Sequence, residues 1–168
     1  MSDASDSAIV RLFLADHVVA DASQKLNILG GNVQIITWDV RTGMSSPFAL
    51  LVIITFDHDQ ARETPAVEVV LENEAGDPVA LPSLAPGGDP QYVRMGSAAP
   101  VEEPSFRGIY VPRRIIKPRQ QIVMAFPNGL PLAVGQAYIW RVRIDQETRD
   151  DWTETFYVPG PHPGTVVG

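Results

Sequence analysis

Residues 48–56 read FALLVIITF, a stretch in which Thr55 is the only polar side chain. β-Branched and aromatic residues favour an extended backbone. A strand that is apolar at nearly every position needs cover on both of its faces, because an uncovered face would meet water. We therefore predict that Phe48 to Phe56 is the central strand of a sheet.

Similar short runs recur along the chain, separated by many of its 15 prolines and 13 glycines. Further strands are predicted at residues 9–14, 26–29, 32–40, 66–71, 78–81, 120–126, 137–145 and 152–158. Gly30-Gly31 lies between two of these runs and predicts a hairpin turn, because glycine tolerates the positive φ that such turns need. Residues 16–25 and 58–63 stay ambiguous, since each also fits a short helix. The pattern as a whole predicts an all-β sandwich of about eight to ten strands.

The length of 168 residues predicts one domain, which we place at residues 8–158. Residues 1–7 are polar and acidic and are predicted to be a flexible N-terminal segment. Pro82 to Pro104 has no strand pattern and is predicted to be a long irregular loop. Residues 159–168 are rich in proline and glycine. We predict a C-terminal arm there, which would suit addition to the sheet edge of a neighbour.

The composition restricts the classes of function. The chain is 45% apolar and 20% charged, as in ordinary globular proteins, and its net charge of −7 argues against binding to nucleic acid or anionic membranes. The absence of cysteine excludes cysteine catalysis and thiolate metal sites. Neither a secretory signal nor an apolar run long enough to cross a membrane is present, so we expect a cytoplasmic protein.

The segment Leu132-Ala133-Val134-Gly135-Gln136-Ala137-Tyr138 has a leucine six residues and a glycine three residues before a tyrosine. It resembles the tyrosine corner of immunoglobulin-like and fibronectin type III sandwiches, with Val134 and Gln136 in place of the usual proline and threonine. The resemblance implies an immunoglobulin-like sandwich in which the Tyr138 hydroxyl bonds back to upstream backbone. Gly135 and Tyr138 are therefore expected to be structural. The alternation that follows predicts core positions for Trp140 and, in the last strand, Trp152.

A second resemblance covers nearly the whole chain. Leu14-Ala15-Asp16, Lys25 to Gly31, Gly135 to Asp145 and Trp152 to Val158 are similar to a family of small single-domain bacterial proteins, mostly actinobacterial, to which no activity is assigned. The resemblance implies a single bacterial domain and brings no catalytic residues with it.

Asp57-His58-Asp59 is the most suggestive cluster for chemistry, because two carboxylates and an imidazole can bind a metal. Asp57 and Asp59 are weak metal candidates, since His58 would face away from them in an extended chain. A solvated loop explains the same residues. Neither a serine nucleophile motif nor a glycine-rich phosphate loop is present, so we predict no catalytic residue, no cofactor and no enzyme.

A basic segment from Arg107 to Arg119 stands out in this acidic chain. Five cations and a tyrosine lie in it, with no acidic residue between Ser105 and Phe126: Arg107, Tyr110, Arg113, Arg114, Lys117 and Arg119. Pro112 and Pro118 place it at a sheet edge or in a loop. The cations can protect a sheet edge, contact a protein or bind single-stranded nucleic acid.

These observations predict a noncatalytic structural or protein-binding module whose partner is a protein, including a second copy of the chain. The basic segment supplies its predicted partner-binding residues. One alternative is a sandwich module that binds a small ligand, either a carbohydrate or a metal. Another is a component of a phage-like or other homomeric assembly.

Overall fold

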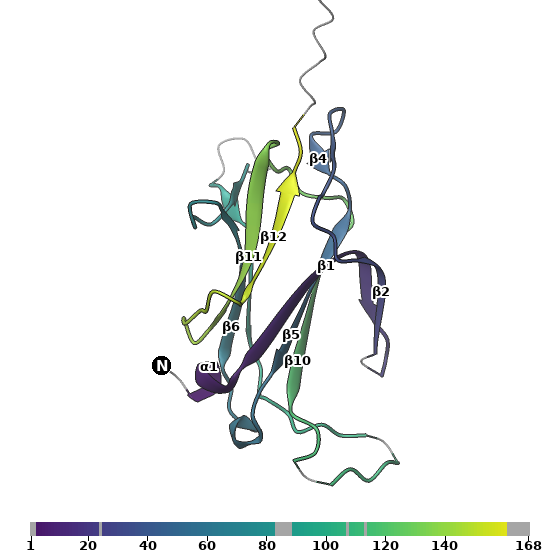
Figure 1. Cartoon of the computed structure of the whole chain (residues 1–168), viewed down its shortest axis with the longest axis vertical. Coiled ribbons are helices and arrows are strands. Elements are labelled where there is room, and N and C mark those ends of the chain that lie inside the picture. The colour runs from purple at the N-terminus through teal and green to yellow at the C-terminus, as the bar shows by residue number, and fades with distance from the viewer. Residues whose placement is uncertain (1–2, 24, 83–88, 107, 113, 161–168) are drawn as a thin grey trace, which may run out of the picture.

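The computed structural model of the chain describes residues 3–23, 25–82, 89–106, 108–112 and 114–160. Two four-stranded sheets that pack face to face form the body of the structure (Figure 1), and the strands within each sheet pair antiparallel. Helical structure is limited, in the described part, to α1 (Asp3–Ser7) and the single 3-10 turn η1 (His58–Gln60). The all-β prediction is therefore confirmed.

Each sheet has a simple strand order. The first sheet runs β10-β5-β1-β2, and the second runs β12-β11-β6-β9. The strands of the first are β1 (Ile9–Ala20), β2 (Leu26–Gly31), β5 (Phe48–Thr55) and β10 (Arg119–Phe126). Those of the second are β6 (Ala66–Asn73), β9 (Arg94–Ala98), β11 (Gln136–Ile144) and β12 (Thr153–Val158). Two short pairs complete the fold: β3 (Trp38–Asp39) with β4 (Met44–Ser45), and β7 (Ala80–Leu81) with β8 (Gln91–Tyr92).

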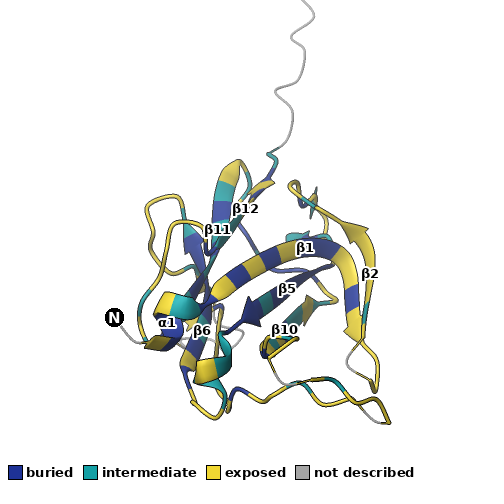
Figure 2. Ribbon diagram, turned by 60° about the horizontal axis from the view of Figure 1, so that its bottom comes forward, coloured by how far each residue is buried: buried dark blue, intermediate teal, exposed yellow. Residues whose placement is uncertain are grey.

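Strand β5 lies between β1 and β10, as its composition predicts. Its alternate residues Leu50, Val52 and Ile54 point to the second sheet and belong to the main core. Ala49 and Leu51 point the other way and are also buried, in a smaller cluster with Ala15 and Val18. Figure 2 shows how β1 arches across the molecule, with its buried and exposed residues alternating along most of its length.

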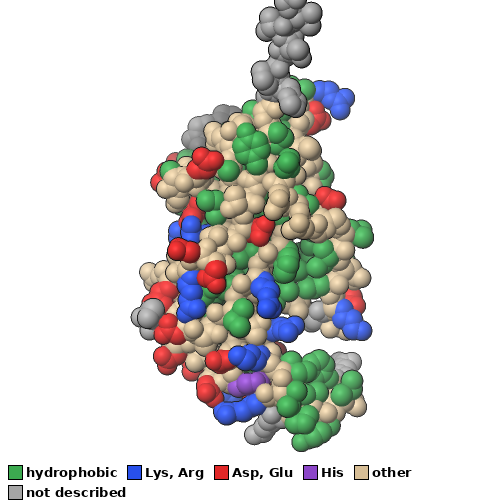
Figure 3. Space-filling model, viewed as in Figure 1, with side chains coloured by type: hydrophobic (Ala, Val, Ile, Leu, Met, Phe, Trp, Pro, Cys, Tyr) green, Lys and Arg blue, Asp and Glu red, His purple; other side chains and the backbone are tan. Residues whose placement is uncertain are grey.

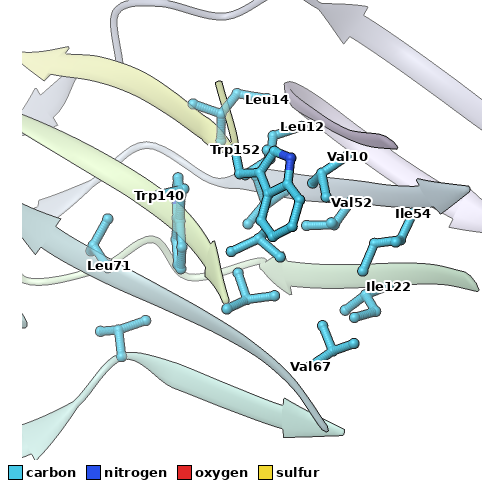
Figure 4. Close-up of a cluster of buried hydrophobic side chains, with 14 of the residues drawn as sticks. Val10, Leu12, Leu14, Val52, Ile54, Val67, Leu71, Ile122, Trp140 and Trp152 are labelled. Carbon is cyan, nitrogen blue, oxygen red and sulfur yellow. The ribbon is translucent and has the colours of Figure 1, made fainter. Parts of the chain in front are cut away.

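Aromatic side chains link the two sheets. Phe48 of β5 lies 5.8 Å from Phe156 of β12, and Phe126 of β10 stacks at 5.7 Å on Trp140 of β11, measured between ring centroids. Trp140 and Trp152 are fully buried between the layers (Figure 4). Burying a side chain of this size contributes about 1.5–3 kcal/mol or more, so these rings are a main source of the attraction between the sheets.

The predicted hydrogen bond of Tyr138 is confirmed. Its hydroxyl donates to the carbonyl oxygen of Ala133 at 3.0 Å, and burial raises the pKa of the phenol. Gly135 has a φ of +72°, a conformation that costs a side-chain-bearing residue energy. The glycine thus allows the bend that brings Ala133 back to the tyrosine.

The hairpin prediction at Gly30-Gly31 is wrong. Strand β2 pairs backward with β1, which continues to Ala20, and the strand expected at 32–40 is reduced to β3. The turn lies instead after Ala20, where the Asp21 carboxylate accepts hydrogen bonds from the Ser23 hydroxyl and from the amides of Ser23 and Lys25. These bonds lower the pKa of Asp21. An aspartate side chain therefore makes the turn, and residues 16–20, which also fitted a short helix, belong to β1 instead.

The prediction of an irregular loop over 82–104 is wrong for its second half. Residues 91–92 form β8, and β9 adds an edge strand to the second sheet beside β6. Strand β9 is short and largely exposed, with Gly96 at its centre, so it lacks the apolar alternation that reveals a half-buried strand. Residues 83–88 lie outside the described part of the chain.

The structure describes most of the N-terminal segment but only the first two residues of the predicted C-terminal arm. Within the N-terminal segment, α1 buries Ala4 and Ser5, and Arg149 donates hydrogen bonds to the carbonyls of Ser5 and Asp6 at 2.8 and 2.9 Å. These contacts hold the helix against the turn between β11 and β12. Of the proposed C-terminal arm, residues 161–168 lie outside the described residues.

Replacing Tyr138 with phenylalanine tests the tyrosine corner. Loss of the hydrogen bond to Ala133 is expected to lower the free energy of unfolding by about 0.5–1.5 kcal/mol in urea titrations near neutral pH. Because the pKa of Tyr138 is raised above its ordinary 10.0, its unfolded form ionises first. The stabilisation should be complete below pH 10 and be lost as the pH rises further. Tyr157→Phe, at an exposed position, is the control, and an equal loss in both variants would contradict the assignment.

Candidate functional site

The basic segment belongs to the loop that joins β9 to β10, and this loop projects from one end of the sandwich. The structure describes Tyr110, Arg114, Lys117 and Arg119 of the predicted site, whereas Arg107 and Arg113 lie outside the described residues. Its apolar residues are unusually exposed: 89% for Tyr110, 69% for Ile115 and 66% for Ile109. Together with the exposed Phe106, we call these residues the apolar tip. Figure 3 shows hydrophobic side chains gathered on this end of the molecule.

Two ion pairs hold the base of the loop against η1. Arg114 contacts the carboxylate of Asp59 at 2.7 Å, and Lys117 pairs with Asp57. The backbone adds further bonds: the amide of Phe56 donates to the carbonyl oxygen of Pro118 at 3.0 Å, and Val101 exchanges bonds with Arg62 and Glu63 at 2.9 and 2.8 Å. The sequence analysis treated the acidic cluster and the basic segment as separate candidates, and the structure brings them together.

The two weak metal candidates, Asp57 and Asp59, are the carboxylates of these ion pairs. Asp57 and Asp59 each face a cation of the loop, and a metal would have to displace that cation. Among the residues that the structure describes, no group of three or more histidine, aspartate or glutamate side chains is arranged to hold a metal ion. The two carboxylates therefore position the loop.

The same ion pairs change the electrostatic character of the segment. Lys117 and Arg114 are compensated within the chain, and Arg119 at the start of β10 has no ion pair within the described ranges. Among the residues of the segment that the structure describes, the most exposed are apolar or aromatic: Tyr110, Ile115 and Ile109. The sequence analysis missed Phe106, Ile109 and Ile115, although their signal is visible in retrospect: apolar residues between prolines, with no strand alternation to bury them.

Two pockets lie elsewhere on the surface. One, of about 420 Å³, is lined by Asp3, Asp59, Glu63 and Asp145 among others, and Asp145 already accepts a hydrogen bond from the Ala66 amide. The other, of about 490 Å³, lies between β6 and β9 beside Glu68 and Arg143. These two side chains pair with each other at 3.2 Å. In each pocket, therefore, some of the polar groups are engaged within the chain.

A buried carboxylate lies on the outer face of the second sheet. Glu72 is almost fully buried and accepts hydrogen bonds from Arg141 at 2.7 Å and Arg143 at 2.8 Å. Both arginines lie on β11, which pairs directly with β6. Two charge-assisted bonds satisfy this carboxylate, so the cluster fastens neighbouring strands rather than presenting a reactive group.

The tryptophans do not provide a platform for carbohydrate. Trp140 and Trp152 are buried in the core, as predicted, and Trp38 is half-buried against it. Stacking on a sugar ring requires an exposed aromatic face. The most exposed aromatic side chain of the described residues is Tyr110, in the apolar tip.

Comparison of the chain with protein-family models, with curated proteins and with solved structures gives no match. The resemblance to the small bacterial family therefore stays a prediction. Over the described ranges, the structure contains no helix of the length and apolar character that crossing a membrane requires.

Removing the two carboxylates tests the positioning of the loop. We expect an Asp57→Asn/Asp59→Asn variant to show faster hydrogen exchange and faster proteolysis across residues 106–118. The melting temperature should change little, because exposed ion pairs contribute about 0–1 kcal/mol each.

An Asp150→Asn/Asp151→Asn variant is the matched control, since it removes the same two charges at an exposed turn. Equal exchange rates in the two variants would show that the ion pairs do not hold the loop.

Proposed function

We propose that this protein is a noncatalytic protein-binding module that engages its partner through the apolar tip of the basic segment. The observation that carries the proposal is the exposure of Tyr110, Ile115 and Ile109 on a single loop. Concentrated apolar surface of this kind marks interaction sites on folded proteins.

The chemistry of the tip suits a protein partner. Tyrosine is enriched at the centres of protein interfaces, where its ring fills a pocket and its hydroxyl finds a polar partner. The ion pairs at the base hold the loop before binding, and this reduces the entropy lost on association. Burial of these exposed apolar side chains in an apolar depression of a partner would remove them from water, which is favourable and would stabilise the complex.

We further infer an immunoglobulin-like topology for the sandwich. In such folds the tyrosine corner marks strand F, which pairs with strands C and G. Strand β11 carries Tyr138 and lies between β6 and β12, which then take the places of C and G. The neighbours β1, β5 and β10 in the other sheet take the places of A, B and E. Loops at the ends of such sandwiches commonly carry binding residues, and the apolar tip lies on one of them.

Site-specific photo-crosslinking tests the proposed function in the native host. A photoreactive phenylalanine analogue at position 110 is expected to crosslink to one defined protein. The same analogue at Val40, an exposed apolar position in another turn, is the control. With the purified partner, Tyr110→Ala should weaken binding about tenfold or more, as expected for an aromatic anchor. Identical crosslinks from both positions, or unchanged binding by Tyr110→Ala, would contradict the proposal.

A further inference from the structure

The two sheets have four edges, and three of them are protected. Strand β10 begins with Arg119 and has a proline on either side, Pro118 and Pro127. Strand β12 is partly covered by residues 34–36, which exchange backbone hydrogen bonds with Tyr157 at 2.9 and 3.0 Å. Strand β9 is short and begins with Arg94. Charges, prolines and cover are the usual protection against pairing with another chain.

Within the described structure, the fourth edge, β2, is not covered by another segment, and Lys25 directly before it is the nearest charge along the chain. Its residues Leu26–Gly31 include neither a charged residue nor a proline. It is the outermost strand of the first sheet, and Figures 1 and 2 show its outer side open in both views. Ile28 is 43% exposed and Leu29 66% exposed, so apolar side chains accompany the open backbone.

The pairing with β1 determines which backbone groups face outward. The amide of Asp21 donates to the carbonyl of Lys25 at 2.9 Å, which makes this a hydrogen-bonded pair of the β1–β2 hairpin. Bonded and non-bonded pairs alternate along an antiparallel ladder. From the observed register, Asn27 and Leu29 therefore direct their amides and carbonyls to β1. Leu26 and Ile28 direct theirs to the open edge.

We propose that two copies of the chain pair through β2, antiparallel, about a two-fold axis at Ile28. A two-fold axis perpendicular to the sheet keeps each side chain on its own face, so Ile28 lies opposite its counterpart and Leu26 opposite Gly30. The outward amide and carbonyl of each Ile28 then bond to those of the other copy. The two four-stranded sheets join into one sheet of eight strands, the sum of four from each chain.

The register about Ile28 is complementary to itself, which favours a second copy as the occupant of this edge, and charge does not oppose the pairing. With a net charge of −7, two copies repel each other at most orientations, but the pairing segment is neutral and brings no like charges opposite each other. The proposed alignment places Lys25 of one copy beside Gly31 of the other, which is also neutral. A partner recognised by charge would find no complementary group on β2.

Sedimentation velocity and native mass spectrometry of the full chain test the proposal. The wild-type chain is expected to reach the mass of two chains as concentration rises. Ile28→Lys places two lysines directly opposite each other and should raise the dissociation constant about tenfold or more. Leu29→Lys is the matched control, because residue 29 lies opposite Asn27 and the two added charges are only diagonal neighbours, so their repulsion is weaker. An equimolar mixture of Ile28→Lys and Ile28→Glu should form the mixed dimer.

Hydrogen exchange on the wild-type chain gives a second measurement that needs no variant. The amides of Leu26 and Ile28 should become protected as concentration rises, whereas those of Asn27 and Leu29 should be protected throughout. A chain that stays monomeric at its highest soluble concentration would overturn the proposal. So would an Ile28→Lys variant that dimerises as the wild type does.

The dimer and the proposed function use different surfaces, so their failures can be told apart. Tyr110→Ala is expected to leave the dissociation constant of the dimer unchanged. Dimers that are lost in Tyr110→Ala and kept in Ile28→Lys would overturn pairing at β2 and assign self-association to the apolar tip.

Discussion

Strand β5 has apolar side chains on both faces, and each face needs a cover of its own. The second sheet covers the inner face through the aromatic contacts of Phe48 with Phe156 and of Phe126 with Trp140. The outer face has no second layer, so Leu51 is covered by neighbouring strands and by Val18 on the arched part of β1. Because β1 must reach across this face, it is the longest strand of the described chain, and β2 follows it to the edge.

The way in which the faces of the two sheets are covered limits the surfaces that are open for binding. The inner faces are occupied by the core, and the polar groups on the outer face of the second sheet are fastened in the cluster around Glu72. Among the described residues, two peripheral surfaces concentrate open groups, namely the apolar tip and the edge of β2. They differ in kind, since the tip offers side chains and the edge offers backbone groups, and they suit different partners.

The sequence predicts well those elements whose pattern reflects burial. The strands at 48–56, 120–126 and 137–145, the buried tryptophans and the hydrogen bond of Tyr138 all follow from apolar spacing or from one motif. The sequence predicts poorly those elements whose position depends on the strand with which they pair. Gly30-Gly31 resembles a hairpin turn, yet the Asp21 side chain forms the turn that positions β2, and β9 is held by β6 despite lacking a pattern of its own. The basic segment contacts Asp57 and Asp59, which lie far from it in the sequence, so no local sequence pattern predicts this contact.

The polar and apolar groups of the described structure differ in how far they are engaged. Asp57, Asp59 and Glu72 each contact a cation of the same chain. Within the described structure, the buried indole nitrogens of Trp38 and Trp140 have no hydrogen-bond partner. The open groups at the surface are the ring of Tyr110, its isoleucine neighbours and the backbone edge beside Ile28. The free energy falls when the apolar side chains leave water or when the open strand completes a β-ladder. Both events require a second surface. Open apolar and backbone groups of this kind are what the proposed partner and the proposed dimer would cover.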